Sequence, residues 1–150
     1  MKIVNGLAAL LMLASLSSSA YAADKNYTRG SVWLVSLIKV EPGKGDDYVD
    51  SIKATIQGVY DEAIKEKVIL SYKVLVGDSA SPNDWDTVIL VELPNYAALD
   101  TLETKFDAIG EKVYGSADKA DATDKKAMAD RAPIRTVFGE KILQEIHFAK

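Results

Sequence analysis

Residues 68–93, with the sequence VILSYKVLVGDSASPNDWDTVILVEL, contain two apolar stretches separated by a turn-rich loop. The stretches Val68–Val76 and Trp85–Leu93 are rich in β-branched and aromatic residues, which is typical of strands. The loop Gly77–Asp84 carries glycine, serine, proline, asparagine and aspartate, the residues that favour turns. This part of the chain therefore predicts a β-hairpin.

Centring the hairpin in residues 77–86 fixes which residues lie opposite each other and which side chains share a face. The register places Ser71 opposite Glu92 and Lys73 opposite Leu90, and successive residues of a strand point to opposite faces. One face then carries Tyr72, Val74, Ile89 and Val91, and the other carries Ile69, Leu75, Val88 and Leu90 together with Ser71, Lys73 and Glu92.

Helical and extended patterns alternate on both sides of the hairpin. Apolar residues three and four apart predict two amphipathic helices. The expected elements are a strand at 32–40, a helix at 46–67 with Val49, Ile52, Ile56, Val59 and Ala63 on its apolar face, a helix from the Asn95 cap to Gly115, a short surface helix at 118–132 and a last strand at 137–148 with a bulge at Gly139.

The resulting order is strand, helix, strand, strand, helix, strand, with an extra short helix before the last strand. This order consists of two strand-helix-strand units joined by a hairpin. Because the crossover in each unit is right-handed, few topologies are possible, and the expected class is α+β with a ferredoxin-like βαββαβ topology. The strands at 32–40 and 85–93 are the most continuously apolar and should be central. The other two carry more polar residues, as edge strands do.

The two helices cover one face of this sheet, and the other face needs a partner. Its apolar residues form a patch too large to leave exposed to water in a monomer. A second copy packed by two-fold symmetry is the simplest partner, so we expect a homodimer. The dimer-face candidates are Ile69, Leu75, Val88 and Leu90.

The same face supplies the candidates for ligand binding, which are Trp33, Ser71, Lys73, Leu90 and Glu92. Lys73 and Glu92, placed diagonally, are expected to form a partly buried ion pair. Two interpretations stay open: the pair fixes the register of the dimer, or it orients a small apolar ligand between the sheets. The aromatic residues Trp33, Tyr72 and Trp85 are more typical of a core or an interface than of a cofactor cage.

The first 22 residues have the composition of a signal peptide. Lys2 precedes an apolar stretch, and Ala20-Tyr21-Ala22 is a signal-peptidase motif, so we expect cleavage after Ala22 and a periplasmic or secreted protein. Residues 23–31 are a polar leader, and residues 32–150 form the domain. Because Lys2 is the only charged residue among the first 22, the remaining 128 residues keep 17 of 18 basic and all 22 acidic side chains, for a net charge of −5. That balance argues against nucleic acid and, after cleavage, against a membrane as partner.

The amino-acid composition excludes several kinds of catalytic and metal-binding site. The chain has no cysteine and one histidine, His147, and it lacks a G-x-S-x-G motif, so no nucleophilic triad and no histidine-based zinc site is expected. No catalytic residue can be assigned, and we expect no metal and no cofactor. Arg131 and Arg135 flank Pro133, where an ion pair to a neighbouring helix and anion capture are the alternatives. The loop aspartates do not fit an EF-hand and are expected to form turns.

Several motifs resemble known proteins. The segment from Val40-Glu41-Pro42-Gly43-Lys44 to Val91-Glu92-Leu93-Pro94-Asn95 resembles the dimeric alpha-beta barrel superfamily, which includes cofactor-independent antibiotic-biosynthesis-type monooxygenases. Residues 33–146 are closer to a group of uncharacterised secreted bacterial proteins. The marks of that group are Tyr72-Lys73-Val74-Leu75, Asn83-Asp84-Trp85-Asp86, Phe106-Asp107-Ala108-Ile109 and Ile134-Arg135. The monooxygenases often carry a histidine in the helix after the third strand, and this chain has none there.

Two functions follow as hypotheses. The favoured one is a non-catalytic binding or structural module that holds a small apolar molecule. The alternative is a cofactor-independent oxygenase-like enzyme acting on a small aromatic substrate. A ligand-sized cavity with tyrosine, tryptophan or asparagine pointing into it would favour the enzyme, whereas a filled interior would favour the module.

Overall fold

The structure, a computed structural model, describes residues 26–149. The predicted signal peptide and its cleavage site fall outside these residues. In chain order the elements are β1 Tyr27–Val40, α1 Gly45–Ile52, the π-helical turn η1 Lys53–Gln57, α2 Gly58–Lys65, β2 Ser71–Val76, β3 Thr87–Leu93, the 3-10 turn η2 Tyr96–Thr101, α3 Leu102–Tyr114, α4 Ala117–Arg131, the 3-10 turn η3 Ala132–Ile134 and β4 Arg135–Phe148.

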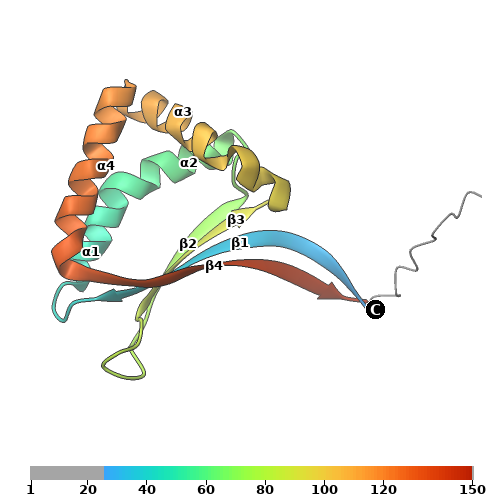
Figure 1. The fold of residues 1–150 in the computed structure, drawn as a ribbon, viewed down its shortest axis with the longest axis horizontal. Coiled ribbons are helices and arrows are strands. Elements are labelled where there is room, and N and C mark those ends of the chain that lie inside the picture. Colours follow the sequence, from blue (N-terminus) through green and yellow to red (C-terminus); the bar gives the residue numbers. More distant parts are fainter. Residues whose placement is uncertain (1–25, 150) are drawn as a thin grey trace, which may run out of the picture.

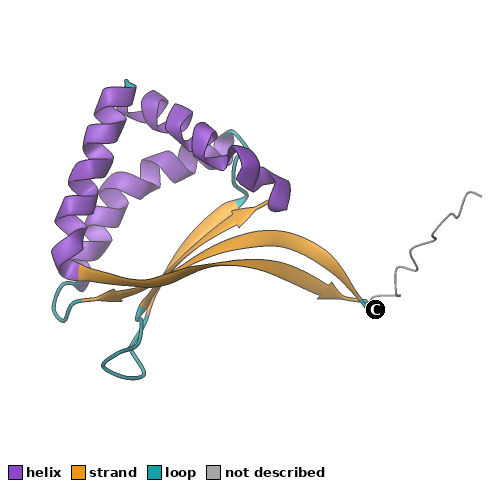
Figure 2. Cartoon of the chain, in the orientation of Figure 1, coloured by secondary structure: helices purple, strands orange, loops and turns teal. Residues whose placement is uncertain are grey.

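The four strands form one antiparallel sheet in the order β2-β3-β1-β4, with the helices on one face (Figures 1 and 2). This is the ferredoxin-like topology that the sequence predicts, with β1 and β3 in the centre. Within residues 26–149 no helix is both long and apolar enough to cross a membrane.

The predicted hairpin register is confirmed. Ser71 pairs with Glu92 and Lys73 with Leu90 along the β2–β3 ladder. The predicted bulge is also present: the pairing of β1 with β4 shifts near Gly139, whose φ of 157° is a backbone conformation that side-chain-bearing residues rarely adopt.

Strand β1 begins at Tyr27 rather than at Val32, so part of the expected polar leader belongs to the sheet. Residues 27–29 pair with the end of β4, and β3 joins the sheet only at Val32. The outer parts of β1 and β4 therefore form a two-stranded arm that extends past the helices (Figure 1). A two-stranded arm buries little apolar surface, so its residues can be polar. A pattern of apolar residues therefore does not identify this part of β1 as a strand.

The long first helix contains a π-helical turn that the sequence does not predict. The turn adds one residue to the helical ladder and so changes which side chains face the sheet. Tyr48 is buried instead of Val49, and Ile52 and Ala63 follow it on the buried side. The predicted apolar face is therefore wrong at the N-terminal end of the helix, where Tyr48 and not Val49 is buried.

The second helical segment begins and ends as its sequence indicates. The side chain of Asn95 accepts a hydrogen bond from the Ala98 amide at 3.2 Å. Gly115, with φ of 88°, ends α3 in the left-handed conformation that glycine adopts easily. Helix α4 follows at once, and only Ala127 and Arg131 of its residues are buried.

The core lies between the helices and the sheet. Tyr72, Val74, Ile89 and Val91 all pack in it, as the predicted face assignment requires. The fully buried part of the core comprises Val32, Ile38, Val40, Tyr48, Ile52, Ala63, Val68, Ile69, Ile89, Val91, Leu93 and Ile109.

Candidate functional site

The sheet face opposite the helices carries the predicted ligand-binding residues side by side. Pairing of the four strands arranges this open face in three rows across β2, β3, β1 and β4. The rows are Ser71–Glu92–Trp33–Leu143, Lys73–Leu90–Val35–Lys141 and Leu75–Val88–Leu37–Gly139. Their role in ligand binding stays a prediction.

One dimer-face candidate is wrong. Ile69 is 1% exposed and belongs to the helix-side core, whereas Leu75, Val88 and Leu90 lie on the open face. The alternation assumes a strand from Val68, but β2 begins at Ser71. Before it, the chain turns at Lys67, with φ of 59°, and the Ile69 amide is bonded to the end of α2, which directs its side chain inward.

The expected ion pair between Lys73 and Glu92 is not formed among the described residues. The Lys73 ammonium lies 5.5 Å from the centroid of the Trp33 ring, a cation–π distance. The Glu92 carboxylate instead accepts a hydrogen bond from the Ser71 hydroxyl at 2.6 Å. Lys73 therefore contacts the Trp33 ring, and not the Glu92 carboxylate that the sequence predicts as its partner.

On the helix side the sheet is only partly covered. A row of paired residues crosses this face as Tyr72–Val91–Leu34–Ile142. The helices pack on Tyr72 and Val91 and partly on Leu34, whereas Ile142 remains 50% exposed. The helix layer thus ends above β1 and leaves space over it.

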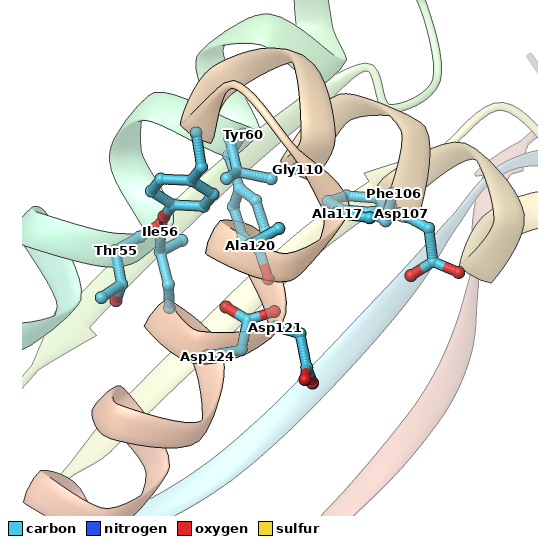
Figure 3. Close-up of a pocket in the computed structure, with 12 residues that line it drawn as sticks. Thr55, Ile56, Tyr60, Phe106, Asp107, Gly110, Ala117, Ala120, Asp121 and Asp124 are labelled. Atoms are coloured by element: carbon cyan, nitrogen blue, oxygen red, sulfur yellow. Dashed lines mark hydrogen bonds between the residues drawn. The ribbon is translucent and has the colours of Figure 1, made fainter.

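Two cavities open there. The sheet-side cavity, of about 400 Å³, is lined by Leu34, Tyr60, Val91, Leu99, Leu102, Glu103 and Phe106. The interhelical cavity, of about 420 Å³, lies between the long first helix, α3 and α4 (Figure 3). Tyr60 and Phe106 line both, with ring centroids 5.5 Å apart. These two rings therefore form the wall between the two cavities.

The hydroxyl of Tyr60 differs from those of its neighbours. The Tyr114 hydroxyl donates to the Thr55 carbonyl at 2.9 Å, and the Tyr72 hydroxyl donates to Asp61 at 3.0 Å. Within residues 26–149 the Tyr60 hydroxyl has no hydrogen-bond partner. Every side-chain polar atom in this range that is sealed from solvent does have a partner. The Tyr60 hydroxyl therefore opens onto the space that its side chain lines.

Burial keeps the phenol of Tyr60 protonated. Burial raises the pKa of Tyr60 above its usual value of 10.0, the Arg131 guanidinium opposes this rise and the Glu140 carboxylate adds to it. At neutral pH Tyr60 is therefore a hydrogen-bond donor and a poor base.

Three aspartates, Asp107, Asp121 and Asp124, line the interhelical cavity (Figure 3). Asp121 is paired with Lys125 at 2.7 Å on the exposed side of α4. Among residues 26–149, no lysine or arginine lines either cavity. The space therefore favours neutral molecules over anions.

Arg131 is 6% exposed and holds α4 against the first helix. Its guanidinium donates to the Ser51 hydroxyl at 2.9 Å, to the Ser51 carbonyl at 3.2 Å and to the Thr55 hydroxyl. Arg135 donates to the Tyr48 hydroxyl at 3.2 Å. Neither arginine has a carboxylate within 4 Å among the described residues, so the expected ion pair to a neighbouring helix is wrong.

The remaining candidates lie elsewhere. His147 is on the exposed arm, 3.9 Å from Glu145, and lines neither cavity. Asp84 accepts a hydrogen bond from the Ala80 amide within the β2–β3 loop, which confirms its turn-forming role. Asp86 instead accepts from the Val40 amide and so ties the end of the loop to β1. Within residues 26–149 no group of three or more metal-ligating side chains is brought together.

Sequence reasoning missed Tyr60 as a site residue, and it named Phe106 within the motif Phe106-Asp107-Ala108-Ile109 but not as a site residue. One signal was present: the segment that forms α4 is alanine-rich and only weakly amphipathic. Ala117 and Ala120 of this helix line the interhelical cavity. Small side chains facing aromatic ones leave unfilled space between helices.

No protein-family model matches the chain, and no curated protein matches it in sequence. Among solved structures it is similar to a dimeric ferredoxin-like protein of unknown function from Thermobifida fusca YX, with 12% identity, a TM-score of 0.44 and coverage of 79% of this chain and 92% of that chain. A dimeric ferredoxin-like protein of unknown function from Bacteroides fragilis NCTC 9343 has 14% identity, a TM-score of 0.41 and coverage of 79% and 97%. A Caulobacter crescentus CB15 protein, provisionally assigned as an antibiotic biosynthesis monooxygenase, has 18% identity, a TM-score of 0.37 and coverage of 83% and 93%.

Proposed function

We propose that the chain is an exported, homodimeric binding protein that holds a small, neutral, mainly apolar molecule against Tyr60. The observation that carries the proposal is the Tyr60 hydroxyl, which has no partner within residues 26–149 and stands where two cavities meet. The hydroxyl is not sealed from solvent, so it can donate to a molecule that enters the cavities. A ligand acceptor would take the place of water there.

The shape and lining of the space support this function. Each cavity falls in the range of about 300–1,000 Å³ that small-molecule sites occupy. Leu34, Leu99, Leu102 and Phe106 offer apolar surface, and the aspartates disfavour an anion. The ligand would lie inside one subunit on its helix side, and the space between two sheets stays a second place for it.

The dimer is supported by the open face. Leu75 and Leu143 are 51% and 50% exposed there, and Trp33, Leu37 and Leu90 are only half-buried. Packing this face on a second copy would remove them from water without covering either helix-side cavity.

A matched pair of aromatic probes tests the role of Tyr60. Fluorenone carries a carbonyl acceptor and fluorene does not. Tyr60→Phe should weaken fluorenone binding about 5- to 10-fold, because one neutral hydrogen bond contributes about 1 kcal/mol, and should leave fluorene binding unchanged. Isothermal titration calorimetry measures both affinities.

The control is Tyr72→Phe, which removes a hydroxyl already bonded to Asp61 and should change neither affinity. Ala120→Trp, which fills the interhelical cavity, should weaken binding of any probe held there. A protein that binds neither probe contradicts the binding proposal. Equal effects of Tyr60→Phe and Tyr72→Phe would remove Tyr60 from the site.

An oxygenase-like enzyme is the second candidate, favoured by one observation: a ligand-sized cavity with a tyrosine pointing into it. Oxygen uptake with a hydroquinone, lost in Tyr60→Phe and kept in Tyr72→Phe, would support catalysis. Probe binding without oxygen uptake would support the binding protein.

Export is supported by the leader composition. Protein recovered from the periplasm or medium of an expressing bacterium should have the intact mass of a chain that begins at Ala23. A mature N-terminus inside β1 would contradict this cleavage site, because Tyr27 and the residues after it pair with β4.

A further inference from the structure

The open sheet face carries charges that form no ion pair within residues 26–149. Glu92 is half-buried, and among the described residues its carboxylate is bonded only to the Ser71 hydroxyl. Lys141, on β4, is exposed and makes no ion pair within residues 26–149. Lys73 lies over the Trp33 ring. A carboxylate and an ammonium on the same apolar face thus both lack a counter-ion.

In the proposed dimer, charges without a counter-ion would be energetically costly. Covering the open face would remove Glu92 from water, and a carboxylate buried without a cation is strongly destabilising. In a two-fold dimer every contact occurs twice, so a cation of one copy that meets Glu92 of the other satisfies both carboxylates.

Position distinguishes the two lysines. Glu92 lies in the row of Trp33, and Lys141 lies in the next row, that of Val35. The point midway between Glu92 and Lys141 is therefore over β1, in the middle of the face. A two-fold axis through that point overlaps the two sheets well. The midpoint between Glu92 and Lys73 lies between β3 and the edge strand β2, and an axis there would leave much of the face uncovered.

We propose that Glu92 of each copy pairs with Lys141 of a second copy across the open face, and that this pair sets the orientation of the dimer. The inference rests on the homodimer proposed above. With strands about 4.8 Å apart and rows about 6.8 Å apart, such an axis makes the strands of the two sheets cross at roughly 70°, near the orthogonal class of sheet packing.

Charge reversal in two separate chains tests the pair. Glu92→Lys places two lysines against each other at both contacts of its homodimer, and Lys141→Glu places two glutamates there. Each homodimer should dissociate at least about 100-fold more readily than the wild type, because like charges in contact cost several kcal/mol. In a one-to-one mixture all four charges become complementary. Native mass spectrometry should then show the heterodimer as the main species.

The control mixes Glu92→Lys with Lys73→Glu, and this mixture should not form the heterodimer, because the introduced lysine still meets Lys141 of the other chain. Rescue by Lys73→Glu instead of Lys141→Glu would overturn the pairing, and so would a mixture that stays monomeric while the wild type is a dimer. A wild type that is monomeric at micromolar concentration would contradict the homodimer itself. Recovery of the heterodimer also shows that both variant chains fold.

Discussion

Replacing Leu90 with aspartate should convert the dimer into monomers. Leu90 is half-buried near the centre of the open face, between Lys73 and Val35 in its row. In the dimer the new carboxylate would replace an apolar side chain between two sheets, where the desolvation of a charge costs several kcal/mol even with Lys73 beside it. We expect the dissociation constant to rise at least about 1,000-fold, since each 1.4 kcal/mol is tenfold. Light scattering at micromolar concentration should change from twice the mature mass to the mature mass.

The matched control is Val76→Asp, which adds the same charge at the exposed end of β2, where Val76 is 64% exposed. This variant should stay dimeric. A Leu90→Asp protein that remains a dimer would show that the copies associate through another surface, and the open face would then need a different partner.

The register of the hairpin could be predicted because a strand alternates with a period of two. Centring the hairpin in residues 77–86 pairs Ser71 with Glu92 and puts Tyr72, Val74, Ile89 and Val91 on one face, and these four pack in the core. The central positions of β1 and β3 followed from their continuous apolar sequence, because a strand paired on both edges exposes less of its surface than an edge strand.

The errors have a common physical cause, which is that they depend on contacts between distant segments. Ile69 is directed inward by a turn at Lys67, and Lys73 contacts the ring of Trp33, which lies far away in sequence. The early start of β1 depends on pairing with the end of β4. No local pattern contains this information.

The cavities could not be predicted for a similar reason. Apolar periodicity identifies Phe106 and Leu102 as facing inward, but not whether the opposite element fills the space between them. That depends on where α4 lies. Ala117 and Ala120 bring this helix close to α3, and its alanines do not reach far enough to fill the interior.

Arg131 is the residue on which the position of α4 depends most. The helix buries only Ala127 and Arg131, so hydrophobic burial contributes little to its attachment. The Arg131 guanidinium instead bonds to the Ser51 carbonyl and to the hydroxyls of Ser51 and Thr55, next to the π-helical turn. Burial lowers the pKa of Arg131 and the nearby Arg135 charge adds to this effect, yet a guanidinium remains protonated at neutral pH.

Arg131→Ala should therefore lower the free energy of unfolding by about 2–4 kcal/mol, because it removes the hydrogen bonds of a charged group and leaves a gap behind α4. Arg131→Met keeps the packing and buries no charge, so it should lower the free energy of unfolding about half as much as Arg131→Ala does. Lys126→Ala, whose side chain is exposed on the same helix, should change stability by less than about 0.5 kcal/mol. Hydrogen exchange should show α4 losing protection before the sheet in Arg131→Ala, and fluorenone binding should weaken with it, because Ala117 and Ala120 would no longer close the interhelical cavity. Uniform loss of protection across the whole chain would instead show that α4 unfolds only with the rest of the domain.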